Sequence, residues 1–496
     1  MRGRPFPLAS RTTTPWPHLL TDLASACYST NSSALPSLKG ELILCASKGQ
    51  ETNVTKDLTT TQTHVSKHPK TPRHPRPRIL QRLLFYLGIF GPGLIAANAG
   101  NDPGGIATYS TMGSQFGYSM LWVMPILVVG VAIVQEMCAR MGAMTGKGLS
   151  DLIRENFPLR LTVFVMFIFL LANGGVVISE FIGIAAALNF FGVPSWIGAP
   201  LGGLLIWWLV VRGSYKRVEK VFLAVTLVFF AYVFSAFLAR PNWGQVLAGT
   251  VIPTVQLKGA YILTLVAAVG TTISPYMQLY VQSAVAERGV QISEYKYERL
   301  EVYVGSLFSV TIAAFILIST AATIFVHSGG KGMPIGSAAQ AAQALAPFLG
   351  VFASQAFAIG LLGAALLAAG ILPLSTSYSL AEAFGFERGV SRTWKEAPFF
   401  WGLFTLLILI GVVIAMLPDL PVIQILLNLY LLNGLLLPIV LFTILYLVNQ
   451  KRLMGRYTNG LLYNVIAYTL AVIVSLLALL YLVTQVLSLF GIQLFG

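Results

Sequence analysis

A carboxylate lies among helix-breaking residues within an otherwise apolar run. Residues 98–108 read Asn-Ala-Gly-Asn-Asp-Pro-Gly-Gly-Ile-Ala-Thr and interrupt a run that extends from Leu83 to about Met112. Glycine and proline are poor helix formers, and Pro103 also lacks a backbone N–H. At membrane depth, a carboxylate such as Asp102 and an unwound backbone are tolerated only where they face protein or a water-filled cavity. We therefore expect a discontinuous transmembrane helix whose carbonyls and carboxylate hold a cation; the alternative is a Pro-Gly kink with a buried, protonated Asp102.

A second break of the same kind follows much later in the chain. Residues 270–278 read Gly-Thr-Thr-Ile-Ser-Pro-Tyr-Met-Gln, again a Gly/Pro interruption with polar side chains in an apolar run. Interrupted segments at corresponding places in two halves of a chain indicate a transporter binding site, although a coincidental kink is the competing explanation.

The composition is that of a membrane protein. Of the 496 residues, 56% are hydrophobic and only 10% are charged, against about 25% charged residues in soluble domains. The three cysteines have neither disulfide-framework nor zinc-site spacing. The net charge of +14 does not indicate nucleic-acid binding, because the basic residues lie in the N-terminal region and in short loops.

Hydropathy predicts an all-α polytopic protein with eleven transmembrane helices. The expected spans are 82–113, 118–139, 159–191, 194–211, 217–239, 258–288, 301–327, 345–381, 397–417, 421–448 and 460–488. The breaks open two blocks of five spans, about 82–239 and 258–448, followed by an extra helix. Because five is odd, the two blocks face opposite ways across the membrane.

The loop charges support this count independently. Going along the chain, loops and termini alternate between basic and nearly uncharged, and the intervening loops hold only Arg240, Lys258 and Lys331. By the positive-inside rule, the N-terminus is cytoplasmic and the C-terminus extracellular. We expect an integral protein of a bacterial plasma membrane.

Residues 1–78 are rich in Ser, Thr, Pro and Lys, a composition that cannot bury a core. We expect a disordered basic extension ahead of a transporter domain at 79–496. Its first part resembles a transit peptide, or it reflects an upstream start codon.

Three acidic residues fall within the spans, namely Asp102, Glu136 and Glu180, and no Lys or Arg does. Glu136 has Arg140 one turn later, which predicts a surface-level pair. Asp102 and Glu180 have no basic partner at their depth, so each must be protonated, hydrated or metal-bound. This favours a cationic substrate over an anionic one.

The run Gly91-Pro-Gly…Asp102-Pro-Gly104 resembles the first-span motif of the NRAMP family of divalent metal transporters. Ser179-Glu-Phe-Ile-Gly183 with Ala187-Leu-Asn189 extends the resemblance to the third span. The resemblance covers about residues 85–490 and implies a LeuT-like inverted five-plus-five repeat with broken first and sixth helices. It also implies that the carbonyls of Ala99 and Thr271 bind the metal with Asp102.

The chain departs from the family pattern at several positions. Gly105 stands where the family has an Asn ligand, Ser274 where it has Met and Tyr276 where it has His. Val177 stands in place of a proton-route Asp, and residues 397–417 lack the family's Arg. A thioether helps to select soft metal ions, whereas oxygen ligands and waters suit Mg²⁺. The pattern resembles the NRAMP-related magnesium transporter branch.

We therefore expect alternating-access transport of Mg²⁺, together with Mn²⁺, into the cytoplasm without proton coupling. The alternatives are a proton-coupled Mn²⁺/Fe²⁺ transporter and an amine or amino-acid transporter on the same fold. A metal-gated sensor is disfavoured because no signalling domain is recognisable, and an enzyme because no nucleophile–base pair is. The expected partners are the metal ion and the lipid bilayer, with no nucleic acid, no obligate protein partner and no resident cofactor.

The expected metal ligands and the residues around them follow from both lines of argument. Ser274 ligates the ion directly or through water, or else bends its helix by bonding to the preceding turn. Glu180 adds negative potential along the path, or is a protonated structural acid. The metal set is Asp102, Ala99, Thr271 and Ser274; Gly105, Tyr276 and Gln278 line a hydrated cavity; Glu180, Asn428 and Asn433 lie along the path, where the two asparagines also fit a role as interhelical hydrogen-bond glue.

Overall fold

The structure is a computed structural model that describes residues 101–213, 228, 230–292, 294–390, 392–418 and 420–490. All of these belong to one compact unit, Arg76–Gly496. The predicted extension at residues 1–78 and the expected ligand Ala99 lie outside the described residues, so both stay predictions.

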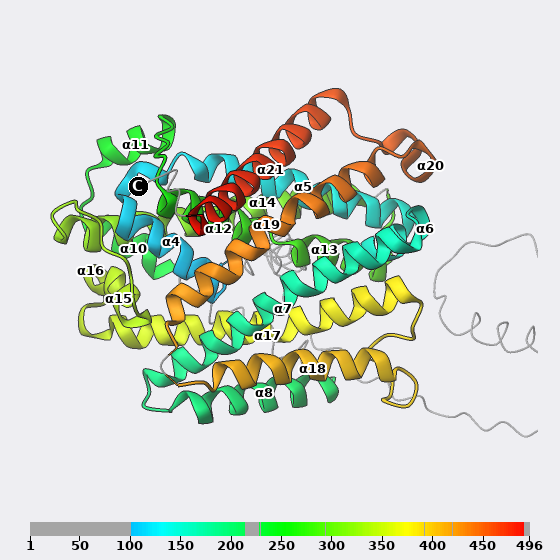
Figure 1. The fold of residues 1–496 in the computed structure, drawn as a ribbon, viewed down its shortest axis with the longest axis horizontal. Coiled ribbons are helices and arrows are strands. Elements are labelled where there is room, and N and C mark those ends of the chain that lie inside the picture. The colour runs from blue at the N-terminus through cyan, green and yellow to red at the C-terminus, as the bar shows by residue number, and fades with distance from the viewer. Residues whose placement is uncertain are drawn as a thin grey trace, which may run out of the picture. The chain divides into compact units, whose positions relative to one another are not determined.

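The described elements are all helical, and Figure 1 traces them in chain order. They are α4 (Pro103–Phe116), η2 (Gly117–Met120), α5 (Val123–Thr145), α6 (Leu149–Asn156), α7 (Leu159–Asn189), α8 (Ser195–Val211), α10 (Phe230–Leu238), α11 (Trp243–Val251), α12 (Gly259–Thr272), α13 (Pro275–Glu287), α14 (Tyr295–Thr320), η4 (Ala321–Phe325), α15 (Ala338–Ala342), η5 (Gln343–Leu345), α16 (Ala346–Leu349), η6 (Gly350–Phe352), α17 (Ala353–Phe384), α18 (Pro398–Ala415), α19 (Val422–Val448), α20 (Lys451–Met454), η7 (Gly455–Tyr457) and α21 (Leu461–Leu489).

Eight described helical segments are long and apolar enough to cross a membrane, which confirms an all-α membrane protein. They correspond to eight of the expected spans. The expected span 194–211 is the shorter apolar helix α8, with 17 residues. The first and fifth expected spans lie partly outside the described residues, so the count of eleven stays a prediction.

Both breaks begin a helix with proline. Asp102 has φ −70° and ψ 176° and caps α4, whose first residue is Pro103. In the sixth expected span, α12 ends at Thr272, Ile273 and Ser274 are not helical, and α13 starts at Pro275. Proline cannot donate the backbone hydrogen bond of a continuous helix but fits the first turn of a new one. The predicted interruption of this span is therefore present.

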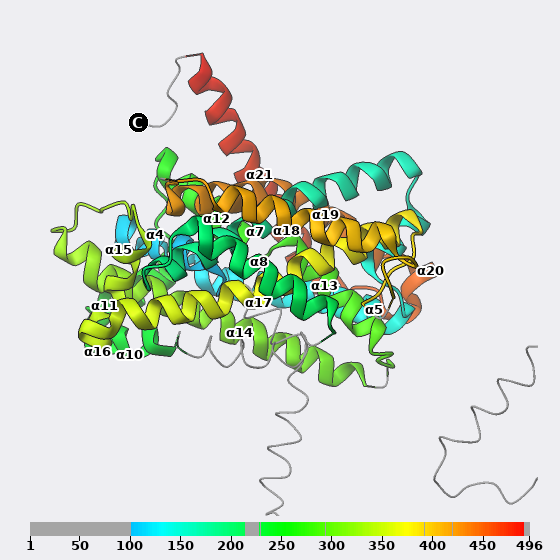
Figure 2. The same cartoon turned by 90° about the horizontal axis from the view of Figure 1, so that it is seen from below.

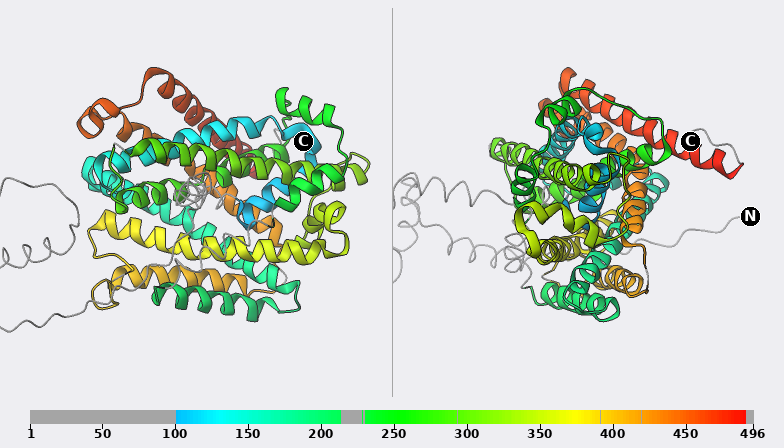
Figure 3. Two further views of the ribbon diagram at one scale, coloured as in Figure 1. Left: turned by 180° about the vertical axis from the view of Figure 1, so that it is seen from behind. Right: turned by 90° about the vertical axis from the view of Figure 1, so that its left-hand side faces the viewer.

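Helix α19 crosses α12 and α4 at close range. A Cβ added at Gly270 of α12 would lie 2.2 Å from the carbonyl oxygen of Tyr430 on α19, so only glycine permits this approach. On the other side of the unit, α7 and α17 pack together, and α18 and α8 lie beside them (Figures 1 and 3). Helix α21 projects away from this packing (Figure 2) and buries little of its surface.

Among the described residues, the basic loops after α5, α17 and α19 meet at one end of the helices, near α6 and α20 (Figure 1). Arg140 of α5 donates to the carbonyl oxygen of Tyr457 at 3.0 Å. Gln282 of α13 donates to the carbonyl oxygen of Lys147 at 3.1 Å. The loop between α17 and α18 reaches the same region, because Arg388 pairs with Asp151 of α6. This agrees with the alternation of loop charge; which end faces the cytoplasm stays a prediction.

Candidate functional site

Asp102 is buried at the start of α4, with a hydrogen bond to each oxygen. Its Oδ1 accepts from the backbone N–H of Gly105 at 2.7 Å, as a helix-capping carboxylate does. Its Oδ2 accepts from the hydroxyl of Tyr430 on α19. A Cβ at Gly104 would lie 1.8 Å from Cε2 of Tyr430, so glycine lets this ring reach the carboxylate. The break thus presents a buried carboxylate whose orientation is fixed from two sides.

The second break is held by Ser274 and Asn433. The Ser274 hydroxyl donates to the carbonyl oxygens of Gly270 at 2.7 Å and Thr271 at 3.1 Å. The Asn433 amide donates to the Gly270 carbonyl at 3.1 Å and to Ser274 Oγ at 3.0 Å. These bonds satisfy carbonyls that the end of α12 would leave unpaired.

Helix α19 brings the two breaks together. Tyr430 contacts Asp102 and Asn433 contacts Ser274, and residues three apart are neighbours on a helix surface, about 5–6 Å between Cβ atoms. A second link runs directly between the half-helices, because the Tyr109 hydroxyl of α4 lies 2.8 Å from Thr272 Oγ1 of α12. These contacts bring the two breaks together.

Glu180 of α7 is fully buried beside this site. Its Oε1 accepts weakly from the Ser179 hydroxyl at 3.4 Å, and its Oε2 has no hydrogen-bond partner. A Cβ at Gly183, one turn later, would lie 2.3 Å from Cγ of Pro103, so α7 packs against the first turn of α4. The two carboxyl groups interact electrostatically. Asp102 and Glu180 therefore bring two buried carboxyl groups to the site from two helices.

The donor set of the described site is oxygen. It offers the Asp102 carboxylate, the Ser274 and Thr271 hydroxyls and the carbonyls at the end of α12. The part of the chain that the structure describes holds no group of three or more His, Cys, Asp or Glu that could bind a metal ion. One or two carboxylates completed by neutral oxygens and water is the usual arrangement for Mg²⁺.

Comparison with known proteins gives the family. Residues 93–484 match the family model described as "Natural resistance-associated macrophage protein-like". The chain belongs to the Nramp family. It is 31% identical over 319 residues to the "Divalent metal cation transporter MntH" of Deinococcus radiodurans, which covers 63% of this chain and 72% of the relative. The MntH of Caldanaerobacter subterraneus is 32% identical over 294 residues, which is 57% of this chain and 68% of that protein. These relatives are named as transporters, and the chain is not an enzyme.

The fold agrees with this membership. A crystal structure of the Eremococcus coleocola manganese transporter superposes with a TM-score of 0.68 over 86% of this chain and 92% of that one, at 21% identity. An inward-facing structure of Mhp1 gives a TM-score of 0.50 over 80% of this chain and 91% of that one, at 16% identity. Both likenesses concern the fold alone.

Most of the predicted residues lie at the site of this Nramp protein, in differing roles. Tyr276 and Gln278 are buried on the first turn of α13, where the Gln278 amide donates to the Ser274 carbonyl at 3.4 Å. Ser274 bonds to the carbonyls of the preceding turn, which was the predicted alternative to a role as metal ligand. Asn433 forms hydrogen bonds between helices, which was the predicted alternative to a place along the path. Gly105 is backbone support for Asp102. Their ligand and cavity roles stay predictions.

Asn428 does not lie at the site. It is on the exposed face of α19, where its Oδ1 accepts from Gln424 at 3.2 Å. Because Asn428 and Asn433 are five residues apart, they do not share a helix face. Its place along the path therefore stays a prediction.

Tyr430 and Tyr109 were missed. The only signal for Tyr430 was its spacing of three from Asn433, which places a hydroxyl and an amide on one face of α19. Their contacts with Asp102 and Thr272 join positions far apart in the sequence.

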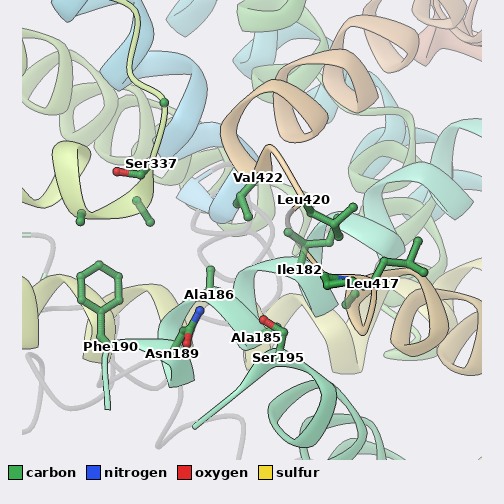
Figure 4. A pocket seen from close by; sticks show the side chains of 15 residues that line it. Ile182, Ala185, Ala186, Asn189, Phe190, Ser195, Ser337, Leu417, Leu420 and Val422 are labelled. Atoms are coloured by element: carbon green, nitrogen blue, oxygen red, sulfur yellow. The ribbon is translucent and has the colours of Figure 1, made fainter. Parts of the chain in front are cut away.

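A cleft of about 550 Å³ opens at the end of the helices opposite the basic loops (Figure 4). Ile182, Ala186 and Asn189 of α7 line one side, and Ser337 and Val422 the other. Ala186 and Val422 also line a small apolar void that reaches Pro103 and Gly183. The cleft and the void share these apolar residues, so only a narrow apolar constriction separates the cleft from the first turn of α4.

Proposed function

We propose that this Nramp protein carries Mg²⁺, together with Mn²⁺, into the cytoplasm by alternating access, with Asp102 as the charged ligand. The observation that carries the proposal is that α19 joins the two breaks: Tyr430 bonds to the buried Asp102 carboxylate, and Asn433 bonds to the Gly270 carbonyl and the Ser274 hydroxyl. The MntH relatives are named as divalent metal cation transporters, which supports a divalent cation as the substrate.

The choice of Mg²⁺ rests on the oxygen donors. Ser274 and Gly105 stand where the family pattern has a thioether and an amide, so the site offers fewer and shorter protein ligands. Mg²⁺ dehydrates reluctantly and keeps several waters in protein sites. A site without a soft ligand loses its preference for softer ions over Mg²⁺.

Proteoliposomes loaded with a Mg²⁺-sensitive dye test this function. Wild type should admit Mg²⁺, and Asp102→Ala at equal incorporation should not, because the site loses its charged ligand. Glu155→Gln is the matched control, since that carboxylate is exposed and pairs with Lys147 at 2.5 Å outside the membrane-spanning segments. Wild type that carries Mn²⁺ but excludes Mg²⁺ would contradict the magnesium assignment and leave a manganese transporter.

We further propose that transport is uncoupled from protons. Val177, in place of the family's Asp, is buried and apolar, and α18 has no charged residue. A pH-sensitive dye in the same liposomes should show no acidification that follows metal entry. Acidification in step with the metal, absent in Asp102→Ala, would establish proton coupling instead.

A further inference from the structure

Buried oxygen atoms without partners continue from the site toward the basic end of the helices. Ser274, Gln278 and Gln282 recur every four residues and so share one face of α13. Gln278 and Gln282 are fully buried, and the Oε1 of each has no hydrogen-bond partner. Gln282 uses its amide nitrogen to reach the carbonyl of Lys147 at the inner end, meaning the end with the basic loops.

Two neighbouring helices add to this face. Asn173 lies seven residues before Glu180 on α7, two turns closer to the inner end, and is fully buried. Its amide donates to Thr376 Oγ1 of α17 at 2.9 Å, and its Oδ1 has no partner. On α17, Thr376, Ser379 and Glu382 recur every three residues and lead to the inner end.

At the inner end, Arg388 pairs with two carboxylates. Its guanidinium lies 3.1 Å from Oδ2 of Asp151 on α6 and 3.3 Å from Oε1 of Glu382 on α17. Glu382 is 6% exposed, and its Oε2 has no hydrogen-bond partner. A Cβ at Gly148 would lie 2.4 Å from that oxygen and 2.9 Å from Ser283 Oγ of α13, so the α5–α6 loop closes tightly over both helices.

Buried acceptor oxygens without donors need an explanation, because an unsatisfied buried polar group destabilises the folded protein. The unsatisfied atoms here are all oxygens, they lie on α7, α13 and α17, and they lead away from a cation site. Water or a hydrated cation satisfies such atoms, and an anion does not.

We propose that these oxygens line the inner route of the transported cation, and that Arg388 closes it by occupying the place between Asp151 and Glu382 that a hydrated divalent cation takes on leaving. This inference rests on the proposed function for the identity of the cation. The Arg388 guanidinium carries positive charge, as the transported cation does. The two therefore compete for the carboxylates of Asp151 and Glu382, and Arg388 must move away before the cation can bind there.

Cysteine accessibility tests the route without requiring transport. In full-length protein with Cys27, Cys45 and Cys138 replaced, Gln282→Cys should react with a membrane-impermeant methanethiosulfonate supplied at the inner end. Val281→Cys is the matched control, because Val281 is equally buried but packs in an apolar cluster with Ala139, Val285 and Val302. Equal reaction of the two cysteines would overturn the route.

The closure is tested by releasing Arg388. Arg388→Gln should raise the rate of methanethiosulfonate modification of Gln282→Cys by about tenfold. This is the size of effect expected when two partly exposed ion pairs, those of Arg388 with Asp151 and with Glu382, are lost. Arg392→Gln should not raise this rate, since its pair with Glu387 spans 3.8 Å between exposed side chains. Asp151→Asn breaks the same closure from the other partner and serves if Arg388→Gln does not fold. An unchanged rate in the folded variant would refute the closure.

Protection by the ion tests the cation's place. In Arg388→Gln with Gln282→Cys, millimolar Mn²⁺ should slow modification, and adding Glu382→Gln should remove that protection. If Mn²⁺ gives no protection, the proposed cation position between Asp151 and Glu382 is wrong. The proposed function fails separately: liposomes of wild type without Mg²⁺ or Mn²⁺ influx would reject transport, whereas the accessibility pattern concerns the route alone.

Discussion

At the scale of single residues, the hydroxyl of Tyr430 orients Asp102, the proposed charged ligand. It donates to Asp102 Oδ2, and a hydrogen bond to a charged group is worth about 1.5–3 kcal/mol. Tyr430→Phe should therefore raise the Mg²⁺ concentration for half-maximal influx by about tenfold, because the ring stays and only the donor is lost. Tyr261→Phe is the control, since its hydroxyl bonds to the Thr254 carbonyl at 2.6 Å, remote from Asp102. Tighter binding in Tyr430→Phe would mean that the hydroxyl competes with the ion.

Single residues also show which parts of the site can be predicted from the sequence alone. Asp102 and Ser274 were predicted because a carboxylate and helix-breaking residues within an apolar run are costly and so point to a site. Tyr430 carries no such cost, because tyrosine is ordinary in a membrane helix, and only its contact reveals its role. Polarity alone does not say which face of a helix a residue occupies, so it could not separate the exposed Asn428 from the buried Asn433.

At the scale of elements, the approach of α19 to the start of α4 depends on the missing side chain of Gly104. Gly104→Ala would place a methyl group 1.8 Å from Cε2 of Tyr430, so the ring must leave Asp102. Mg²⁺ influx should fall by at least about tenfold, as for other overpacked sites. Gly174→Ala is the matched control, because its Cβ would meet nothing within 4 Å and alanine favours the helix. Retained influx in Gly104→Ala at equal incorporation would show that the Tyr430 contact is dispensable.

Helix existence was predictable from hydropathy, whereas helix boundaries were not. The expected span 345–381 is α17 at Ala353–Phe384, preceded by the short helices α15 and α16 within one apolar segment. Composition does not divide such a segment, because the short 3-10 stretches η5 and η6 join its helices without an intervening turn. The break at Ile273 and Ser274 was predictable, since Pro275 removes a backbone donor.

At the scale of the whole molecule, loop charge predicts the direction of transport. Lys331 lies in the loop before α15, where Ser337 lines the cleft of Figure 4, and Lys395 lies in the loop between α17 and α18 that carries Arg388. Cytoplasmic loops carry the excess of Lys and Arg, so the Arg388 end should face the cytoplasm. In cysteine-free protein expressed in bacteria, Lys331→Cys should react with an impermeant maleimide in intact cells, and Lys395→Cys only after permeabilisation. Both side chains are exposed, so burial does not affect the comparison. The reverse pattern would make the cleft the cytoplasmic mouth and Arg388 the plug of the entrance, and the same site would then serve export.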